Sequence, residues 1–118
     1  MEKELFTIQL EATIMDAAEK IERNHARAVV VLKDKKVVGV CSQGDIIRLL
    51  LRGGDIYTMI EKIVQPSFLF LREKDFPMAY QLIRQHGVTI IPIIDNDFHL
   101  VDIVTLPAVL DWLKSSHE

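Results

Sequence analysis

The sequence of 118 residues lacks several features that mark other classes of protein. Its one cysteine, Cys41, cannot form an internal disulfide, which suits a reducing compartment, and its apolar neighbours favour burial as a small hydrophobe. No apolar run approaches the roughly 18 residues that cross a membrane, and no signal peptide is evident. A formal net charge of −3, from 14 basic and 17 acidic residues, argues against a nucleic-acid surface. We therefore expect a compact, soluble, cytoplasmic protein without a membrane segment.

Spacings typical of metal centres and enzyme active sites are also missing. The four histidines and one cysteine form no C-x-x-C or H-E-x-x-H pattern. Ser42 has no histidine near it in the sequence that would indicate a nucleophile and its base. His25 and His86 each end an expected helix, where a histidine interacts favourably with the helix dipole. The sequence therefore predicts no metal site and no catalytic residues.

The sequence does contain an internal repeat. The segment AEKIERNHARAVVVL, which starts at Ala18, aligns with AYQLIRQHGVTIIPI, which starts at Ala79, at an offset of 61 residues (79 − 18). Further on, Gly39 falls against Asp102 at an offset of 63 (102 − 39), so the second hairpin is expected to have two extra residues. Each copy is typical of helix, strand, hairpin turn, strand and helix.

Local signals support these elements. Thr13, followed three residues later by Asp16, indicates a capping box at the start of the first helix. Asp75 can cap the corresponding helix, with Pro77 in its first turn. A short strand is expected before each copy, at residues 5–10 and 68–71. With a division at residue 55, the copies span 1–55 and 56–118, and each is too small for a stable separate core, so we expect one packed module.

Three motifs in this order resemble those of cystathionine β-synthase (CBS) domains. They are T-h-x-x-A at Thr13–Ala17, G-h-h-[ST]-x-x-D at Gly39–Asp45, and H-G-h-x-x-h-P-h-h-D at His86–Asp95. Each motif alone is weak, but their order, spacing and duplication are together specific. The chain, from about residue 5 to residue 113, resembles a tandem CBS pair, also called a Bateman module. The resemblance implies an α+β fold of two β-α-β-β-α repeats packed about a pseudo-two-fold axis.

The resemblance also implies a function. Many members of the family bind adenosine nucleotides in clefts between the repeats, form disc-like dimers, and control an attached enzyme, channel or transporter. We therefore expect a homodimeric regulatory module, not itself an enzyme, that senses an adenine nucleotide of the AMP, ADP or ATP type. The alternative is a non-binding pair that serves in dimerisation or interaction. The run GDIIRLLLRGG is similar to CBS pairs that precede sugar nucleotidyltransferases, so the chain could be the N-terminal part of such an enzyme.

The turn Ser42-Gln43-Gly44-Asp45 has a local and a ligand-binding interpretation. Locally, the serine caps a helix and the aspartate opposes the helix dipole. The same helix N-terminus suits a phosphate, to which the Ser42 hydroxyl could donate. The Asp45 carboxylate could accept both ribose hydroxyls, and Gly44 leaves room for a ligand. In the family that the chain resembles, the Ser/Thr and the Asp of this motif take these roles.

Other candidates follow from the same resemblance. Thr13 and Ile14 match positions near the base, and Ala28, Val29 and Val30 match a strand that walls the pocket. Core packing alone would also explain Ile14, Val29 and Val30. Three arginines could neutralise phosphates, although a solvated face is the commoner place for lone arginines: Arg27, Arg48 and Arg52.

The second copy of the turn departs from the motif. Thr105 keeps the hydroxyl, but Ala108 stands where the first copy has Asp45, and Asp102 replaces the glycine. A ribose diol would lose its acceptor there, and Asp102 adds negative charge near any phosphate. We expect Thr105 to be mainly a helix cap and at most a weaker second site, which leaves one well-formed nucleotide site.

Overall fold

The computed structural model describes residues 3–116, whose elements form two similar series. The first half consists of the 3-10 helix η1 (Lys3–Phe6), β1 (Thr7–Gln9), α1 (Ile14–Asn24), β2 (Ala28–Lys33), β3 (Lys36–Ser42) and α2 (Gln43–Leu51). After the 3-10 helix η2 (Ile60–Lys62), the second half consists of α3 (Phe76–His86), β4 (Ile90–Ile94), β5 (Leu100–Thr105) and α4 (Leu106–Ser116). The predicted order of helix, strand, hairpin, strand and helix is confirmed in both halves. Within residues 3–116, no helix is long and apolar enough to cross a membrane.

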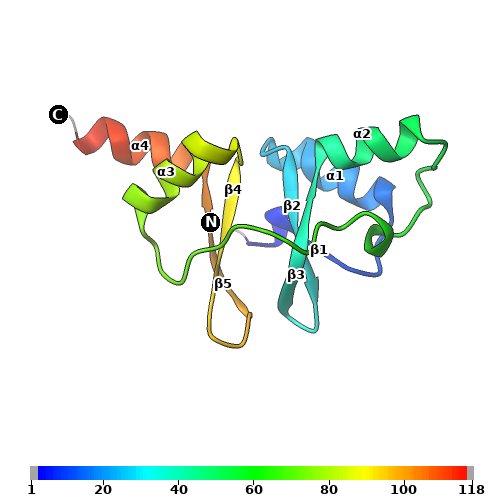
Figure 1. Ribbon diagram of the computed structural model, residues 1–118, viewed down its shortest axis with the longest axis horizontal. Coiled ribbons are helices and arrows are strands. Elements are labelled where there is room, and N and C mark those ends of the chain that lie inside the picture. The colour runs from blue at the N-terminus through cyan, green and yellow to red at the C-terminus, as the bar shows by residue number, and fades with distance from the viewer. Residues whose placement is uncertain (1–2, 117–118) are drawn as a thin grey trace.

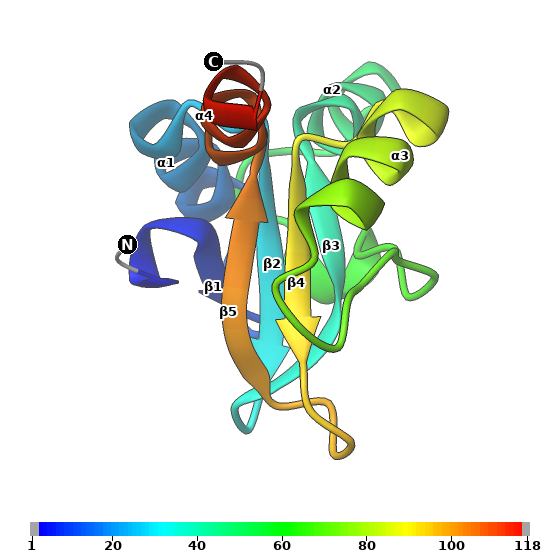
Figure 2. The same cartoon turned by 90° about the vertical axis from the view of Figure 1, so that its left-hand side faces the viewer.

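Two sheets lie face to face in the middle of the molecule (Figure 1, Figure 2). The first has the order β1-β2-β3, with β1 parallel and β3 antiparallel to β2, and the second is the antiparallel pair β4-β5. Helices α1 and α2 pack on the outer side of the first sheet, and α3 and α4 on that of the second. This arrangement is the predicted α+β fold.

The two halves share the central part of the hydrophobic core. Val30 of β2 packs in one buried cluster with Ile94 of β4 and Ile103 of β5. All three side chains are fully buried. The hairpin ends also meet, because the N–H of Val37 donates to the carbonyl of Phe98 at 2.8 Å. The halves therefore form one module, while the division at residue 55 stays a prediction.

The repeat has a different register from the one that the sequence indicated. The N-caps of α1 and α3, Thr13 and Asp75, are 62 residues apart (75 − 13). Ala17 and Ala79, at the same offset, are both fully buried against their sheets. The predicted offset of 61, which aligned Ala18 with Ala79, is therefore wrong. Matching identical letters placed an exposed alanine against a buried one, whereas the buried position is the one that packing fixes.

The second hairpin has one extra residue, not the predicted two. The first turn consists of Asp34 and Lys35, both with positive φ (54° and 69°), as a two-residue type I′ turn requires. The second turn has three residues, 96–98, and Phe98 has a φ of 66°. This is the three-residue loop that ends in a left-handed residue. The helices are offset by 62 residues and the strands after the turn by 63, so the second hairpin contains one inserted residue.

The strands expected before each copy are only partly present. In the first half, β1 is shorter than predicted because η1 occupies the residues before it. In the second half, residues 68–71 form no strand, and only Leu71 makes a parallel bridge, to Ile93. Continuing that ladder would require the N–H of residue 92 to donate to the carbonyl of Leu69. Residue 92 is a proline, which has no N–H, so the pairing stops at Leu71.

Candidate functional site

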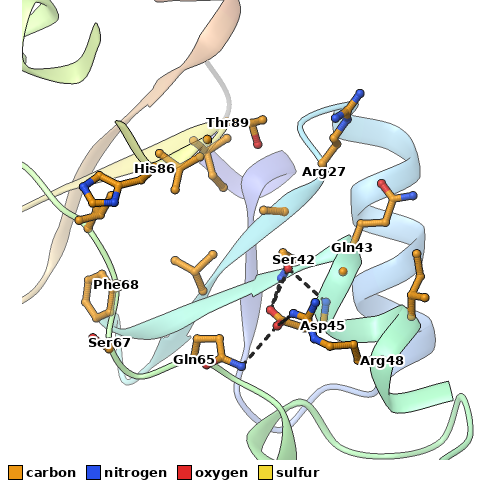
Figure 3. Close-up of a pocket in the computed structure, with 18 residues that line it drawn as sticks. Arg27, Ser42, Gln43, Asp45, Arg48, Gln65, Ser67, Phe68, His86 and Thr89 are labelled. Atoms are coloured by element: carbon orange, nitrogen blue, oxygen red, sulfur yellow. Dashed lines mark hydrogen bonds and ion pairs between the residues drawn. The ribbon is translucent and has the colours of Figure 1, made fainter. Parts of the chain in front are cut away.

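A cavity of about 1180 Å³ lies where the N-terminus of α2 faces the end of α3 and the start of β4. Its walls come from β2, β3 and α2 of the first half, from residues 65–69 of the connecting segment, and from residues 86–90 of the second half. Figure 3 shows Ser42, Asp45, Arg48 and Gln65 gathered on one side, with Phe68 and His86 across from them. The four residues of the predicted binding turn, Ser42, Gln43, Gly44 and Asp45, all line this cavity.

The turn forms a complete capping box at the start of α2. The N–H of Asp45 donates to the Ser42 hydroxyl oxygen at 3.2 Å, and the N–H of Ser42 donates to Asp45 Oδ2 at 2.8 Å. The Ser42 hydroxyl also donates to Oδ2 at 2.9 Å. The local interpretation of the turn is confirmed, because each group satisfies the other at the helix end.

The second oxygen of Asp45 faces two other donors. Arg48 Nη2 donates to Asp45 Oδ1 at 2.7 Å, and Gln65 Nε2 donates to it at 3.3 Å. Gln65 is held there by a backbone bridge to Val40, with N–H to carbonyl distances of 3.0 and 3.2 Å. The carboxylate is thus almost enclosed: the Asp45 residue is 7% exposed.

Gly39 allows the connecting segment to reach this position. A Cβ at Gly39 would lie 2.5 Å from the carbonyl oxygen of Gln65 and 2.5 Å from a methyl group of Val64. Only glycine permits a backbone to pass this close. The glycine that opens the turn motif therefore places Gln65 beside Asp45.

The other predicted ligand residues divide between the cavity and the core. Ala28 lines the cavity, but Thr13, Ile14 and Val30 do not belong to its walls. Thr13 forms a second capping box, with Asp16 at the start of α1. Ile14 and Val30 are buried in the core, with exposures of 1% and 0%. For Ile14 and Val30 the core interpretation describes the structure. Thr13 lies outside the walls of this cavity, and its role in a ligand site stays a prediction.

The charged groups of the cavity favour an anion. Arg27 and Arg48 line it, whereas Arg52, at the end of α2, lies outside it. The single acidic residue among the lining residues, Asp45, is already paired with Arg48. Arg27 has a φ of 65°, and its carbonyl oxygen accepts the N–H of Gln43 at 2.8 Å, which ties β2 to the first turn of α2. An excess of arginine beside a helix N-terminus suits a phosphate.

Several lining residues were not predicted from the sequence. An apolar side is formed by Val40, Phe68, Leu69, Val88 and Ile90, and a polar rim by Gln65, Ser67, His86 and Thr89. Phe68 offers an aromatic face on which a flat base could stack. Apart from Val40 of β3, these residues come from the connecting segment and from the second half, so no local pattern around Ser42 indicates them. The internal repeat was the signal in the sequence that could have pointed to the residues of the second half, because it makes the end of α3 the counterpart of the end of α1.

Two further groups considered in the sequence analysis, Cys41 and Thr105, have structural roles. Cys41 is fully buried, and desolvation, with the charge of Asp45, raises its pKa to about 12, so its thiol stays protonated and unreactive at neutral pH. In the second half, the Thr105 hydroxyl accepts the N–H of Ala108 at 3.3 Å. The predicted packing role of Cys41 and capping role of Thr105 are confirmed. A weaker ligand site at Thr105 stays a prediction.

Asp102, which replaces the glycine in the second copy, forms an ion pair instead. Its carboxylate lies 3.2 Å from Lys74 Nζ and accepts the N–H of Ile103. Burial opposes ionisation, but the N–H of Ile103 and the charge of Lys74 outweigh it and lower the pKa of Asp102.

Within residues 3–116, one group could offer several oxygen or nitrogen ligands to a metal. Asp95, Asp97 and His99 of the β4–β5 hairpin place ligand atoms within 4.8 Å of one another. Asp95 Oδ1 already accepts the N–H groups of Asp97 and His99, at 2.9 Å each, and these bonds lower the pKa of Asp95. The carboxylate thereby stabilises the hairpin turn.

Comparisons with known proteins agree with this architecture. Residues 1–52 match the family model described as the CBS domain. The chain is 27% identical over 101 residues to arabinose 5-phosphate isomerase GutQ of Salmonella typhi. That match covers 84% of this chain and 32% of the relative, so the chain spans about a third of the length of that relative.

Solved structures share the whole fold. A CBS domain pair/ACT domain protein from Thermotoga maritima has a TM-score of 0.80 at 18% identity, over 99% of this chain and 94% of that chain. A CBS domain protein from Pyrobaculum aerophilum, complexed with AMP, has a TM-score of 0.73 at 20% identity, over 96% and 97% of the two chains. The first half of the chain is therefore a CBS domain, and the chain as a whole has the fold of a tandem CBS domain pair, a Bateman module.

Proposed function

We propose that this chain is a regulatory module that binds an adenine nucleotide in the cavity beside α2. The observation that carries the proposal is the position of the capped turn: the N-terminus of this nine-residue helix faces a cavity with walls from both halves. A helix N-terminus with nearby arginines is suited to a phosphate. The similar Pyrobaculum aerophilum protein, complexed with AMP, supports the same class of ligand.

The lining residues suggest how each part of a nucleotide would be held. The phosphate would lie at the first turn of α2, near Ser42 and Arg27. The ribose hydroxyls would donate to Asp45, and the base would contact the apolar side that includes Phe68. The volume of the cavity is ample for a nucleotide, since pockets for ligands of this size occupy about 300–1,000 Å³.

The regulatory role follows from the origin of the walls. A ligand that contacts both halves and the connecting segment favours one arrangement of all three, which is the requirement for passing its presence to another protein. The Ser42 hydroxyl donates to Asp45, an arrangement that favours capping and binding over nucleophilic catalysis. The module itself is accordingly proposed to be a sensor and not an enzyme.

The regulated protein is proposed to act on a sugar phosphate. The curated relative is a sugar-phosphate isomerase of which this chain spans about a third. That relative favours an isomerase over the nucleotidyltransferase of the sequence interpretation. The homodimer implied by the resemblance and the cytoplasmic location expected from the sequence remain parts of the proposal. Apolar side chains exposed on the helices, such as Ile47, Leu51 and Leu110, offer a surface for a second copy, and light scattering would test the dimer.

Isothermal titration calorimetry with AMP, ADP, ATP and S-adenosylmethionine tests the binding proposal. At least one of the phosphorylated ligands should bind, and Asp45→Asn should weaken it at least about tenfold, the loss expected for a hydrogen bond to a charged group. Asp16→Asn is the matched control, because Asp16 makes the same capping box on α1 outside the cavity. Absence of binding by all four ligands, or equal effects of the two substitutions, would contradict the proposal and favour a non-binding module.

A further inference from the structure

The Asp45 carboxylate has all of its acceptor positions in use. Oδ2 accepts the N–H and the hydroxyl of Ser42, and Oδ1 accepts Arg48 at 2.7 Å and Gln65 at 3.3 Å. A carboxylate offers about four lone-pair positions, so these four donors occupy them. A ligand hydroxyl can therefore reach Asp45 only when one of the present donors leaves.

The two oxygens differ in how readily they release a donor. On Oδ2, the bond from the N–H of Ser42 is part of the capping box, and its loss would weaken the cap of α2. On Oδ1, the side chain of Arg48 is 58% exposed while that of Asp45 is 6% exposed. The guanidinium can therefore return to water, and the bond from Gln65 is already long. Oδ1 is therefore the oxygen that a ligand can take, and the two hydroxyls of a ribose would displace both Gln65 and Arg48 from it.

We propose that Arg48 makes the cavity selective for phosphorylated nucleosides over neutral ones. The inference rests on the proposed function and deepens it by assigning the ligand class. Arg48 competes for Asp45 in the empty protein and pairs with the phosphate in the complex. A neutral nucleoside displaces Arg48 without offering it a new partner, whereas a nucleotide supplies a charged one.

The local structure allows Arg48 to take both positions. It lies one turn after Asp45 on α2, and its side chain lines the same cavity as the helix N-terminus. A Cβ at Gly44 would lie 3.3 Å from Arg48 Nη1 and 3.6 Å from Nη2, so the glycine leaves the space in which the guanidinium folds back. Asp16, in the equivalent capping box of α1, is followed three residues later by Glu19, so that box has no such competitor.

Calorimetry with AMP and adenosine tests the inference in three proteins: the natural sequence, Arg48→Ala and Arg52→Ala. Arg52→Ala removes the same charge from the same helix outside the cavity. The natural sequence should bind AMP at least about tenfold more tightly than adenosine, the factor that corresponds to one charge-assisted hydrogen bond. In Arg48→Ala, AMP should bind more weakly and adenosine equally or more tightly, so the ratio of the two constants should fall about tenfold. Arg52→Ala should keep the ratio of the natural sequence.

The possible outcomes separate this inference from the proposed function. If Arg48→Ala binds AMP and adenosine in the natural ratio, the selectivity role is wrong while nucleotide binding stands. If adenosine binds more weakly to Arg48→Ala, the competition for Asp45 is wrong. If neither ligand binds any of the three folded proteins, as judged by circular dichroism, the proposed nucleotide site itself is wrong.

Discussion

Gly39 is the residue over which the connecting segment crosses β3. An alanine Cβ there would lie 2.5 Å from the Gln65 carbonyl oxygen, and backbone cannot yield as a side-chain end can. We expect Gly39→Ala to lower the free energy of unfolding by about 2 kcal/mol, as overpacking does. Urea denaturation would measure the change.

Gly44→Ala provides the matched control for Gly39→Ala. The added Cβ would have the flexible end of the Arg48 side chain as its nearest neighbour, at 3.3 Å. Alanine also stabilises a helix by up to about 1 kcal/mol relative to glycine. This variant should be as stable as the natural sequence or more stable. Equal destabilisation by the two substitutions would contradict the importance of the close approach at Gly39.

The ion pair of Asp102 and Lys74 predicts a pH dependence. Because the folded protein has the lower pKa of Asp102, the stabilisation is fully present above the pKa of the unfolded chain, about 3.9. It is lost as the pH falls through the folded pKa. Lys74→Met should therefore be less stable than the natural sequence at pH 6, with a difference that shrinks below about pH 4. Urea denaturation at several pH values would show this, and a constant difference would contradict the role of the pair.

The hydrogen bonds that cap the helix N-termini were largely predictable from the sequence. The capping boxes at Thr13 and Ser42 were both indicated by spacing, since the motif is a local interaction within four residues. Which box faces a cavity was not predictable from that spacing. The hydrogen bonds between the Ser or Thr and the Asp are the same in the two boxes, and it is the packing of the second half beside α2 that places the Ser42 box at the cavity. For this reason the sequence indicates no role for Phe68, which lines the cavity.

At the scale of elements, the turn of the first hairpin carries avoidable strain. Lys35 has a φ of 69°, a left-handed conformation that costs a non-glycine residue about 1 kcal/mol. Lys35→Gly should raise the free energy of unfolding by up to about 1 kcal/mol, as measured by urea denaturation. Lys33→Gly, in β2 beside the turn, should instead lower it by about 0.5–1 kcal/mol. Opposite signs are the expected result, and destabilisation by both would refute the turn assignment.

The elements themselves were predicted well where the pattern was long and poorly where it was short. Within residues 3–116, the α-helices and the hairpins repeat apolar positions over many residues, so their type was evident. The four residues 68–71 carry too few positions to distinguish a strand from an extended segment. Pro92, which ends their pairing, lies more than 20 residues away in the sequence. A strand forms only where its partner supplies backbone N–H donors, and the residue pattern of the strand itself does not show whether the partner has them.

At the scale of the whole molecule, the shared core predicts one cooperative unfolding transition. Ile103 is fully buried between the two sheets. Ile103→Ala should lower the free energy of unfolding by about 2–5 kcal/mol, and it should do so for both halves together. Trp112 in α4 reports on the second half by fluorescence, while far-UV circular dichroism reports on all helices. The two transitions should coincide before and after the substitution.

Val101→Ala is the control for this experiment, because Val101 lies in the same strand, two residues before Ile103, but is 50% exposed. It should change the free energy of unfolding by less than about 0.5 kcal/mol. Separate transitions by fluorescence and circular dichroism would contradict a shared core. The joint packing of the halves was predictable from their small size, whereas the identity of the residues between the sheets required the structure.

The cavity beside α2 draws its walls from both halves and from the segment that joins them, so neither half alone can hold a ligand in it. A ligand bound there would stabilise the folded module relative to the unfolded chain, by about 2.7 kcal/mol at a concentration a hundredfold above its dissociation constant. The abundance of the ligand would then set the fraction of molecules that are unfolded. Since proteases cleave the unfolded chain, the same quantity would also set how long each molecule survives in the cell.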